Sequence, residues 1–92
     1  MSERRWFYPP ELLGALPAFG LLPQATTPPR FTRDALSDLY RFEIRRLRER
    51  LRAGEVQRAD YQDLVVALRK KYWPLTLTPE AWEKICAGPP QT

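Results

Sequence analysis

Histidine is absent from this chain of 92 residues, and cysteine occurs once, at Cys86. The chain therefore cannot build a zinc site from cysteine and histidine, an iron–sulfur cluster, a histidine general base or an intramolecular disulfide. Asp60 and Asp63 share a predicted helix face, but the sequence places no second acid or base beside them. We therefore expect a protein that is not an enzyme and that uses no cofactor, metal or small-molecule substrate.

Long apolar runs are also missing. The longest mainly apolar stretch, residues 12–22, is interrupted by two glycines and a proline, whereas a membrane-spanning helix needs roughly 20 consecutive apolar residues. Residues 4–7 (RRWF) fit the core of a twin-arginine export signal, but prolines and Glu11 follow where such a signal has a continuous apolar region. We therefore expect a cytoplasmic protein with one reduced thiol and no membrane span.

Lysine is scarce, with three residues against twelve arginines, and the basic charge is concentrated in one segment. Residues 41–52 hold six arginines and two glutamates, while the charges cancel within residues 1–29, 30–40 and 53–92. The formal net charge of +4 therefore comes from this segment alone.

Proline makes the first third of the chain unsuited to long helices or central strands. Six of the ten prolines lie within residues 1–29, and each one sets φ, removes a backbone donor and restricts the residue before it. We therefore predict an extended, proline-rich N-terminal arm over residues 1–31, with at most one helical turn over residues 11–16. The arm carries large apolar side chains that a solvated linker would lack: Trp6, Phe7, Tyr8, Leu12, Leu13, Leu16, Phe19, Leu21 and Leu22.

Two interpretations of the arm are open. It can fold back over its own helices, which would help a small domain because roughly 60 residues bury only about 60% of their extended surface. It can instead lie on another protein and place its apolar side chains in grooves there. We favour the second interpretation, because the nine side chains exceed what two short helices readily cover.

The rest of the chain has apolar residues at helical spacing. A helix over about residues 33–53 is predicted between Thr32 as N-cap and Gly54 as the glycine after its last turn. Its first half has a second apolar side, which we expect the arm to cover. The main apolar stripe consists of Leu36, Tyr40, Ile44, Leu47 and Leu51.

Two further helices follow. The second is predicted over about residues 58–73 and ends at Pro74, and the short connection makes it antiparallel to the first. After a short extended piece at residues 75–77, the third is predicted over about residues 79–87 with Thr78 as its N-cap. Its inner face would hold Trp82, Ile85 and Cys86.

The predicted fold is therefore all-α. An antiparallel helical hairpin and a short C-terminal helix form a small domain over residues 32–87, preceded by the arm and followed by a tail at residues 88–92. We expect Tyr72, Trp73 and Trp82 to belong to its core.

The predicted first helix carries a row of arginines that we call the arginine ladder: Arg41, Arg45, Arg48 and Arg52. At 100° per residue the four lie within about 60° of one another and beside the apolar stripe. Three interpretations are open, namely a solvated face, a site for acidic side chains of a partner protein, and a site for nucleic-acid phosphates. A DNA-binding helix-turn-helix motif is disfavoured, because Asp60 and Asp63 would put negative charge at the start of its recognition helix.

The composition and patterning favour a non-catalytic accessory or adaptor subunit of a larger protein assembly, which docks through the arm and the arginine ladder. The alternative is a small nucleic-acid-binding protein that uses the ladder on phosphates.

Overall fold

The computed structural model describes residues 4–88, in which every regular element is a helix. The predicted all-α class is confirmed, while the predicted tail lies outside the described residues except for Gly88. In chain order the elements are α1 (Pro10–Ala15), the 3₁₀ helix η1 (Leu16–Phe19), α2 (Pro29–Arg52), α3 (Arg58–Lys71), the 3₁₀ helix η2 (Trp73–Thr76) and α4 (Pro79–Cys86).

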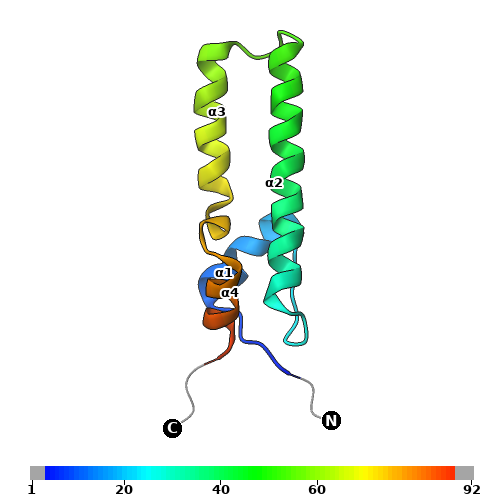
Figure 1. The fold of residues 1–92 in the computed structure, drawn as a ribbon, viewed down its shortest axis with the longest axis vertical. Helices are drawn as coiled ribbons and strands as arrows, with labels where there is room; N and C mark the ends of the chain where they lie inside the picture. Colours follow the sequence, from blue (N-terminus) through cyan, green and yellow to red (C-terminus); the bar gives the residue numbers. More distant parts are fainter. Residues whose placement is uncertain (1–3, 89–92) are drawn as a thin grey trace.

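The molecule is elongated, with dimensions of 56 × 23 × 20 Å. α2 and α3 lie side by side and antiparallel, and they form a hairpin over most of its length (Figure 1). The other helices gather around the first half of α2 at one end, which we call the base. The core therefore lies at the base, and the turn between α2 and α3, the tip, lies far from it.

The tip is shaped by a Schellman motif at the end of α2. The backbone N–H of Gly54 donates to the Leu51 carbonyl (3.1 Å) and that of Glu55 donates to the Arg50 carbonyl (2.9 Å). Gly54 has φ +78°, a left-handed conformation that only glycine adopts without strain. The glycine predicted to end this helix therefore does so.

α2 begins earlier than predicted, because Thr32 is not its N-cap. The N-cap is Pro28, and Pro29 occupies the first turn. Backbone N–H groups of the first turn have no acceptor within the helix, so the N–H that proline lacks costs no hydrogen bond there. Thr32 is buried one turn inside the helix, and its hydroxyl is hydrogen-bonded to the Tyr8 hydroxyl (2.8 Å).

After α3 the chain forms a 3₁₀ helix where an extended piece was predicted. α3 ends at Lys71, two residues before the predicted boundary, and Pro74 lies in the first turn of the 3₁₀ helix η2. Arg33 on α2 holds this segment, because its Nε donates to the Leu77 carbonyl (2.9 Å). The prediction of an extended piece at residues 75–77 was therefore wrong for most of its length.

α4 begins as predicted at its N-cap. The Thr78 Oγ1 accepts from the Ala81 backbone N–H (3.1 Å). Trp82 and Cys86 are fully buried, but Ile85 is 40% exposed, so its assignment to the inner face was wrong. Ile85 lies about 80° from the centre of the face that Trp82 and Cys86 share, which places it at the edge.

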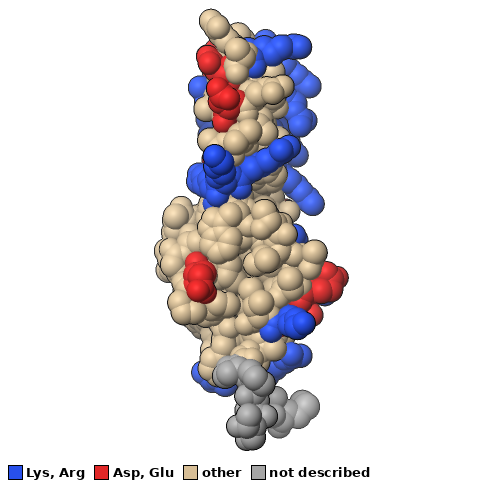
Figure 2. Space-filling view, turned by 90° about the vertical axis from the view of Figure 1, so that its left-hand side faces the viewer, with Lys and Arg blue, Asp and Glu red and all other residues tan. Residues whose placement is uncertain are grey.

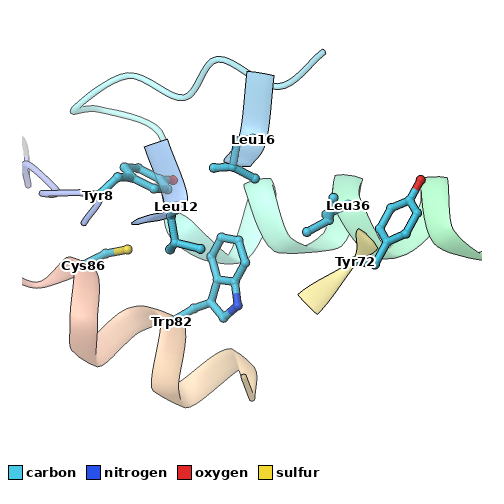
Figure 3. Packing of buried hydrophobic residues seen from close by; sticks show 7 residues of the cluster. All are labelled: Tyr8, Leu12, Leu16, Leu36, Tyr72, Trp82 and Cys86. Carbon is cyan, nitrogen blue, oxygen red and sulfur yellow. The ribbon is translucent and has the colours of Figure 1, made fainter. Parts of the chain in front are cut away.

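The core joins the arm to the base of the hairpin. Tyr8, Leu12 and Leu16 point toward the side chains of α2, the end of α3 and α4 (Figure 3). Trp82 is buried and donates its indole N–H to the Pro74 carbonyl (2.9 Å). Of the three aromatic residues assigned to the core, Trp82 and Tyr72 are buried, whereas Trp73 is 39% exposed because it lies where the chain leaves α3. The buried cluster consists of Tyr8, Leu12, Leu16, Leu36, Tyr72, Trp82 and Cys86.

The arm is therefore neither extended throughout nor free. Pro10 and Pro17 each occupy the first turn of a helix, α1 and η1, where fixed φ favours helix formation. Backbone bonds attach the arm to the rest of the chain, since the Phe7 N–H donates to the Cys86 carbonyl (2.8 Å). The arm covers the first half of the long helix as expected, and docking of its exposed side chains on a partner stays a prediction.

Candidate functional site

The outer part of the hairpin is thinly packed. Within α2 beyond residue 40, the tip and α3, the buried apolar side chains are Leu47 and Val56. No residue of α3 is buried, although Tyr61, Leu64, Val65 and Leu68 form an apolar stripe along this 14-residue helix. Two helices alone leave two open faces, and each face of this hairpin forms a groove.

The first groove, which we call the basic groove, combines an apolar floor with basic edges. The half-buried side chains of Tyr40, Ile44, Tyr61 and Val65 lie in it, together with Val66, which is 46% exposed. Its volume is about 720 Å³. The charged residues that line it are all arginines: Arg41, Arg45 and Arg48 from α2 and Arg69 from α3.

Three of the four residues of the predicted arginine ladder thus share one groove. Arg52 is not among its lining residues, because it is the last residue of α2 and lies beyond the facing turn of α3. Figure 2 shows Lys and Arg side chains in a column along one edge of the hairpin.

The arginines of the groove have few acidic partners. Arg41 lies 3.8 Å from an Asp38 carboxylate oxygen, but both side chains are more than 70% exposed, so the pair contributes little. Within residues 4–88, no carboxylate oxygen lies within 4 Å of Arg45, Arg48 or Arg69. The groove therefore presents guanidinium groups that are free to bind an acidic ligand.

Sequence reasoning missed the contribution of α3. Tyr61, Val65 and Arg69 recur every four residues on α3, and all three line the basic groove together with Tyr40, Ile44 and Arg48 of α2. The spacing was visible in the sequence. Its meaning depends on how α2 and α3 are aligned, and the length of the tip sets that alignment.

The second groove, which we call the mixed groove, has charges of both signs and a closed lower end. Glu43 accepts a hydrogen bond from the Tyr72 hydroxyl and pairs with Lys71 (3.2 Å). Burial, with Glu43 beside it, raises the pKa of Tyr72. Phe19 of η1 packs on Tyr72 with ring centroids 4.6 Å apart. The apolar and basic residues higher in this groove include Phe42, Arg46, Leu47, Arg50 and Leu64.

The predicted site residues of the arm fall into three groups. Tyr8, Leu12 and Leu16 are buried in the chain's own core, so their assignment to a partner surface was wrong in this fold. Trp6, Phe19 and Leu21 pack partly buried against that core. Phe7, Leu13 and Leu22 remain exposed, and none of them lines the basic groove.

Cys86, the one cysteine of the chain, lies in the core of the base. Burial raises the pKa of the Cys86 thiol to about 11, so the thiol is protonated and shielded at neutral pH. Within residues 4–88, no three acidic or cysteine side chains gather as metal ligands, and none of the helices there has the length and hydropathy of a membrane span. Comparison of the chain with protein-family models, curated proteins and solved structures found no match.

Proposed function

We propose that this protein is a non-catalytic adaptor subunit that binds a partner protein through the α2–α3 hairpin. The observation that carries the proposal is the apolar stripe of α3, on which no side chain is buried. Phe42, Leu64 and Val66 are each at least 40% exposed on the same hairpin. Apolar surface concentrated in one region and edged by charge is typical of an interaction site.

Of the two contact surfaces expected from the sequence, the arm and the arginine ladder, this proposal retains the hairpin that carries the ladder. The arm residues Tyr8, Leu12 and Leu16 stabilise the base, and the base in turn holds one end of the hairpin. A helix pair is stabilised mainly by packing of its apolar faces. A partner that covers the outer hairpin would therefore supply the packing that the chain itself does not. The cytoplasmic location expected from the single thiol belongs to the same proposal.

The test is affinity purification from nuclease-treated lysate, with cross-linking and mass spectrometry to identify the contact. The variant Phe42→Ser/Leu64→Ser/Val66→Ser removes exposed apolar groups from both faces of the hairpin and should abolish recovery of the partner. Leu22→Ser is the matched control, because Leu22 is 77% exposed at the base. Equal recovery of the partner with the triple variant and with Leu22→Ser would contradict the proposal, as would recovery of only a free monomer from the unmodified chain.

Nucleic acid is the second candidate ligand. The favourable observation is that Arg45 and Arg48 have no carboxylate oxygen within 4 Å among residues 4–88. In that case log affinity should fall linearly with log salt, by roughly 0.7–0.9 per phosphate neutralised, and Arg45→Ala/Arg48→Ala should reduce the slope. The apolar floor of the groove favours a protein, because phosphate contacts would leave that floor uncovered.

A further inference from the structure

We propose that the basic groove binds an acidic amphipathic helix of the partner protein. This inference rests on the proposed function and specifies the chemistry of the partner. It starts from the composition of the groove, where five apolar or aromatic side chains and four arginines occur without a single acidic one.

The groove is long enough to hold roughly two to three turns of a helix. Its lining runs from Tyr40 to Arg48 on α2 and from Tyr61 to Arg69 on α3, which corresponds to about 12 Å along each helix axis. A third helix placed between the two would complete a three-helix bundle with ordinary interaxial distances of about 8–10 Å. The contact needs roughly two to three turns of the incoming helix.

The order of side chains along the groove indicates what this helix must carry. Ile44 lies midway along the α2 part of the lining and Val65 midway along the α3 part, while Tyr40 and Tyr61 begin the two parts and therefore lie toward opposite ends of this antiparallel pair. Apolar residues at i, i+3, i+4 and i+7 of the incoming helix would cover this floor.

The edges of the groove set the charge of the incoming helix. Arg41, Arg45 and Arg48 follow the α2 edge at spacings of four and three residues. Asp or Glu residues along one flank of the incoming helix would meet them at matching intervals, and arginine can bind carboxylates through two parallel hydrogen bonds.

The same charges disfavour a second copy of this chain as the occupant. In a two-fold symmetric contact the same surface lies on both sides, and the basic groove has four arginines and no acidic residue that could pair with the arginines of the other copy. Like charges placed opposite one another in an interface disfavour it. The mixed groove is less suited to an acidic helix, because Glu43 lies in it and Phe19 closes its lower end.

The experiment selects helices without assuming a partner. A phage-displayed library of helical 18-residue peptides, randomised on one face and one flank, is selected against the full chain, and the affinities of the enriched peptides are measured by fluorescence anisotropy. Enriched peptides should be amphipathic with an acidic flank. The variant Arg45→Glu/Arg48→Glu should weaken their binding by about tenfold or more, since truncated or reversed charge pairs in interfaces cost this much.

The control variant is Arg46→Glu/Arg50→Glu, which reverses two arginines of the mixed groove. It should change affinity by less than about threefold, the scale of a distant screened charge. Exchange of the acidic flank of a peptide for lysine should restore its binding to Arg45→Glu/Arg48→Glu. Circular dichroism of each variant should match that of the unmodified chain.

Several results would overturn the inference: no enriched peptide, enriched peptides without an acidic flank, or equal loss of affinity in both arginine variants. Tight binding of a 20-nucleotide single-stranded RNA that depends on Arg45 and Arg48, with no peptide enriched, would assign the groove to nucleic acid. If the cellular partner is lost with Phe42→Ser/Leu64→Ser/Val66→Ser but is retained with Arg45→Glu/Arg48→Glu, the adaptor function stands and the acidic helix does not.

Discussion

Individual polar atoms in the core of the base are each satisfied by a specific partner. The Tyr8 hydroxyl lies 2.7 Å from the Thr27 carbonyl oxygen and 2.8 Å from Thr32 Oγ1. Because a carbonyl oxygen can only accept, Tyr8 donates to Thr27 and accepts from Thr32. The bond to Thr32 connects Tyr8 to α2, and the bond to Thr27 connects it to the segment that precedes α2.

Removal of the Tyr8 hydroxyl should therefore destabilise the fold. Tyr8→Phe leaves the buried Thr32 hydroxyl without this partner, and the expected loss is about 1–3 kcal/mol in the free energy of unfolding. Urea denaturation followed by circular dichroism measures it. The control is Thr32→Val, in which the hydroxyl partner of Tyr8 is absent. Tyr8→Phe should lower the free energy of unfolding less in Thr32→Val than in the unmodified chain. Strictly additive losses in the double variant would argue against the bond.

The Cys86 thiol gives the base a dependence on alkaline pH. Burial raises the thiol pKa from 9.0 to about 11 in the folded chain, so the folded state keeps a proton that the unfolded state releases. This contribution is fully present below pH 9 and is lost as the pH rises toward 11, by at most about 1.4 kcal/mol per pH unit for one proton. Denaturation of the unmodified chain and of Cys86→Ala between pH 8 and pH 11, compared at each step, isolates this effect. Parallel curves would show that the thiol does not contribute.

Short local signals control where the elements begin and end. Proline in the first turn starts α1, η1 and α2, and glycine with positive φ ends η1 and α2. The same two residue types that suggested an irregular arm thus act as helix starts and stops. The effect of a proline or glycine depends on its position within a helix, so substitutions of the same residue type at two positions can test it.

Two glycines should respond to alanine with opposite sign. Gly54→Ala forces a side chain into φ +78° at the tip and should destabilise the chain by about 1 kcal/mol. Gly14 lies within α1 and has open space where alanine would place its Cβ, so Gly14→Ala should stabilise the chain by about 0.4–1 kcal/mol. Thermal melts of the two variants provide the comparison. A change of the same sign in both would contradict this account of the glycines.

The molecule as a whole divides into a well-packed base and a thinly packed hairpin. The buried cluster at the base draws on the arm, α2, α4 and Tyr72 at the end of α3, whereas the outer hairpin buries few side chains. The base also links residues far apart in the sequence, such as Arg30 and Glu83, whose side chains pair at 3.0 Å. Local stability should therefore decrease from the base toward the tip.

Hydrogen exchange can measure this gradient directly. Amides in residues 44–52 and 58–66 should exchange through local opening and show lower protection than amides near Leu36 and Trp82, which open only with global unfolding. Native-state exchange followed by NMR gives the opening free energy of each amide. Addition of a peptide bound in the basic groove should raise protection in the outer hairpin first. Uniform protection along α2 would contradict the gradient.

The sequence was sufficient for features that depend on neighbours along the chain. The helical class, the Thr78 cap, the glycine at the tip and the stripe around Leu36 follow from residue spacing and backbone preference, which act over a few residues. The arginine ladder was visible for the same reason, because four residues on one helix share a face through helical geometry alone.

Tertiary structure decided which apolar surface is used internally. The sequence does not indicate whether α2 and α4 or another protein cover the side chains of Tyr8, Leu12 and Leu16. Either surface would bury the same apolar area. Only the path of the arm over the base settles this choice. The same holds for Arg69, which joins Arg41, Arg45 and Arg48 because the alignment of two antiparallel helices places it there.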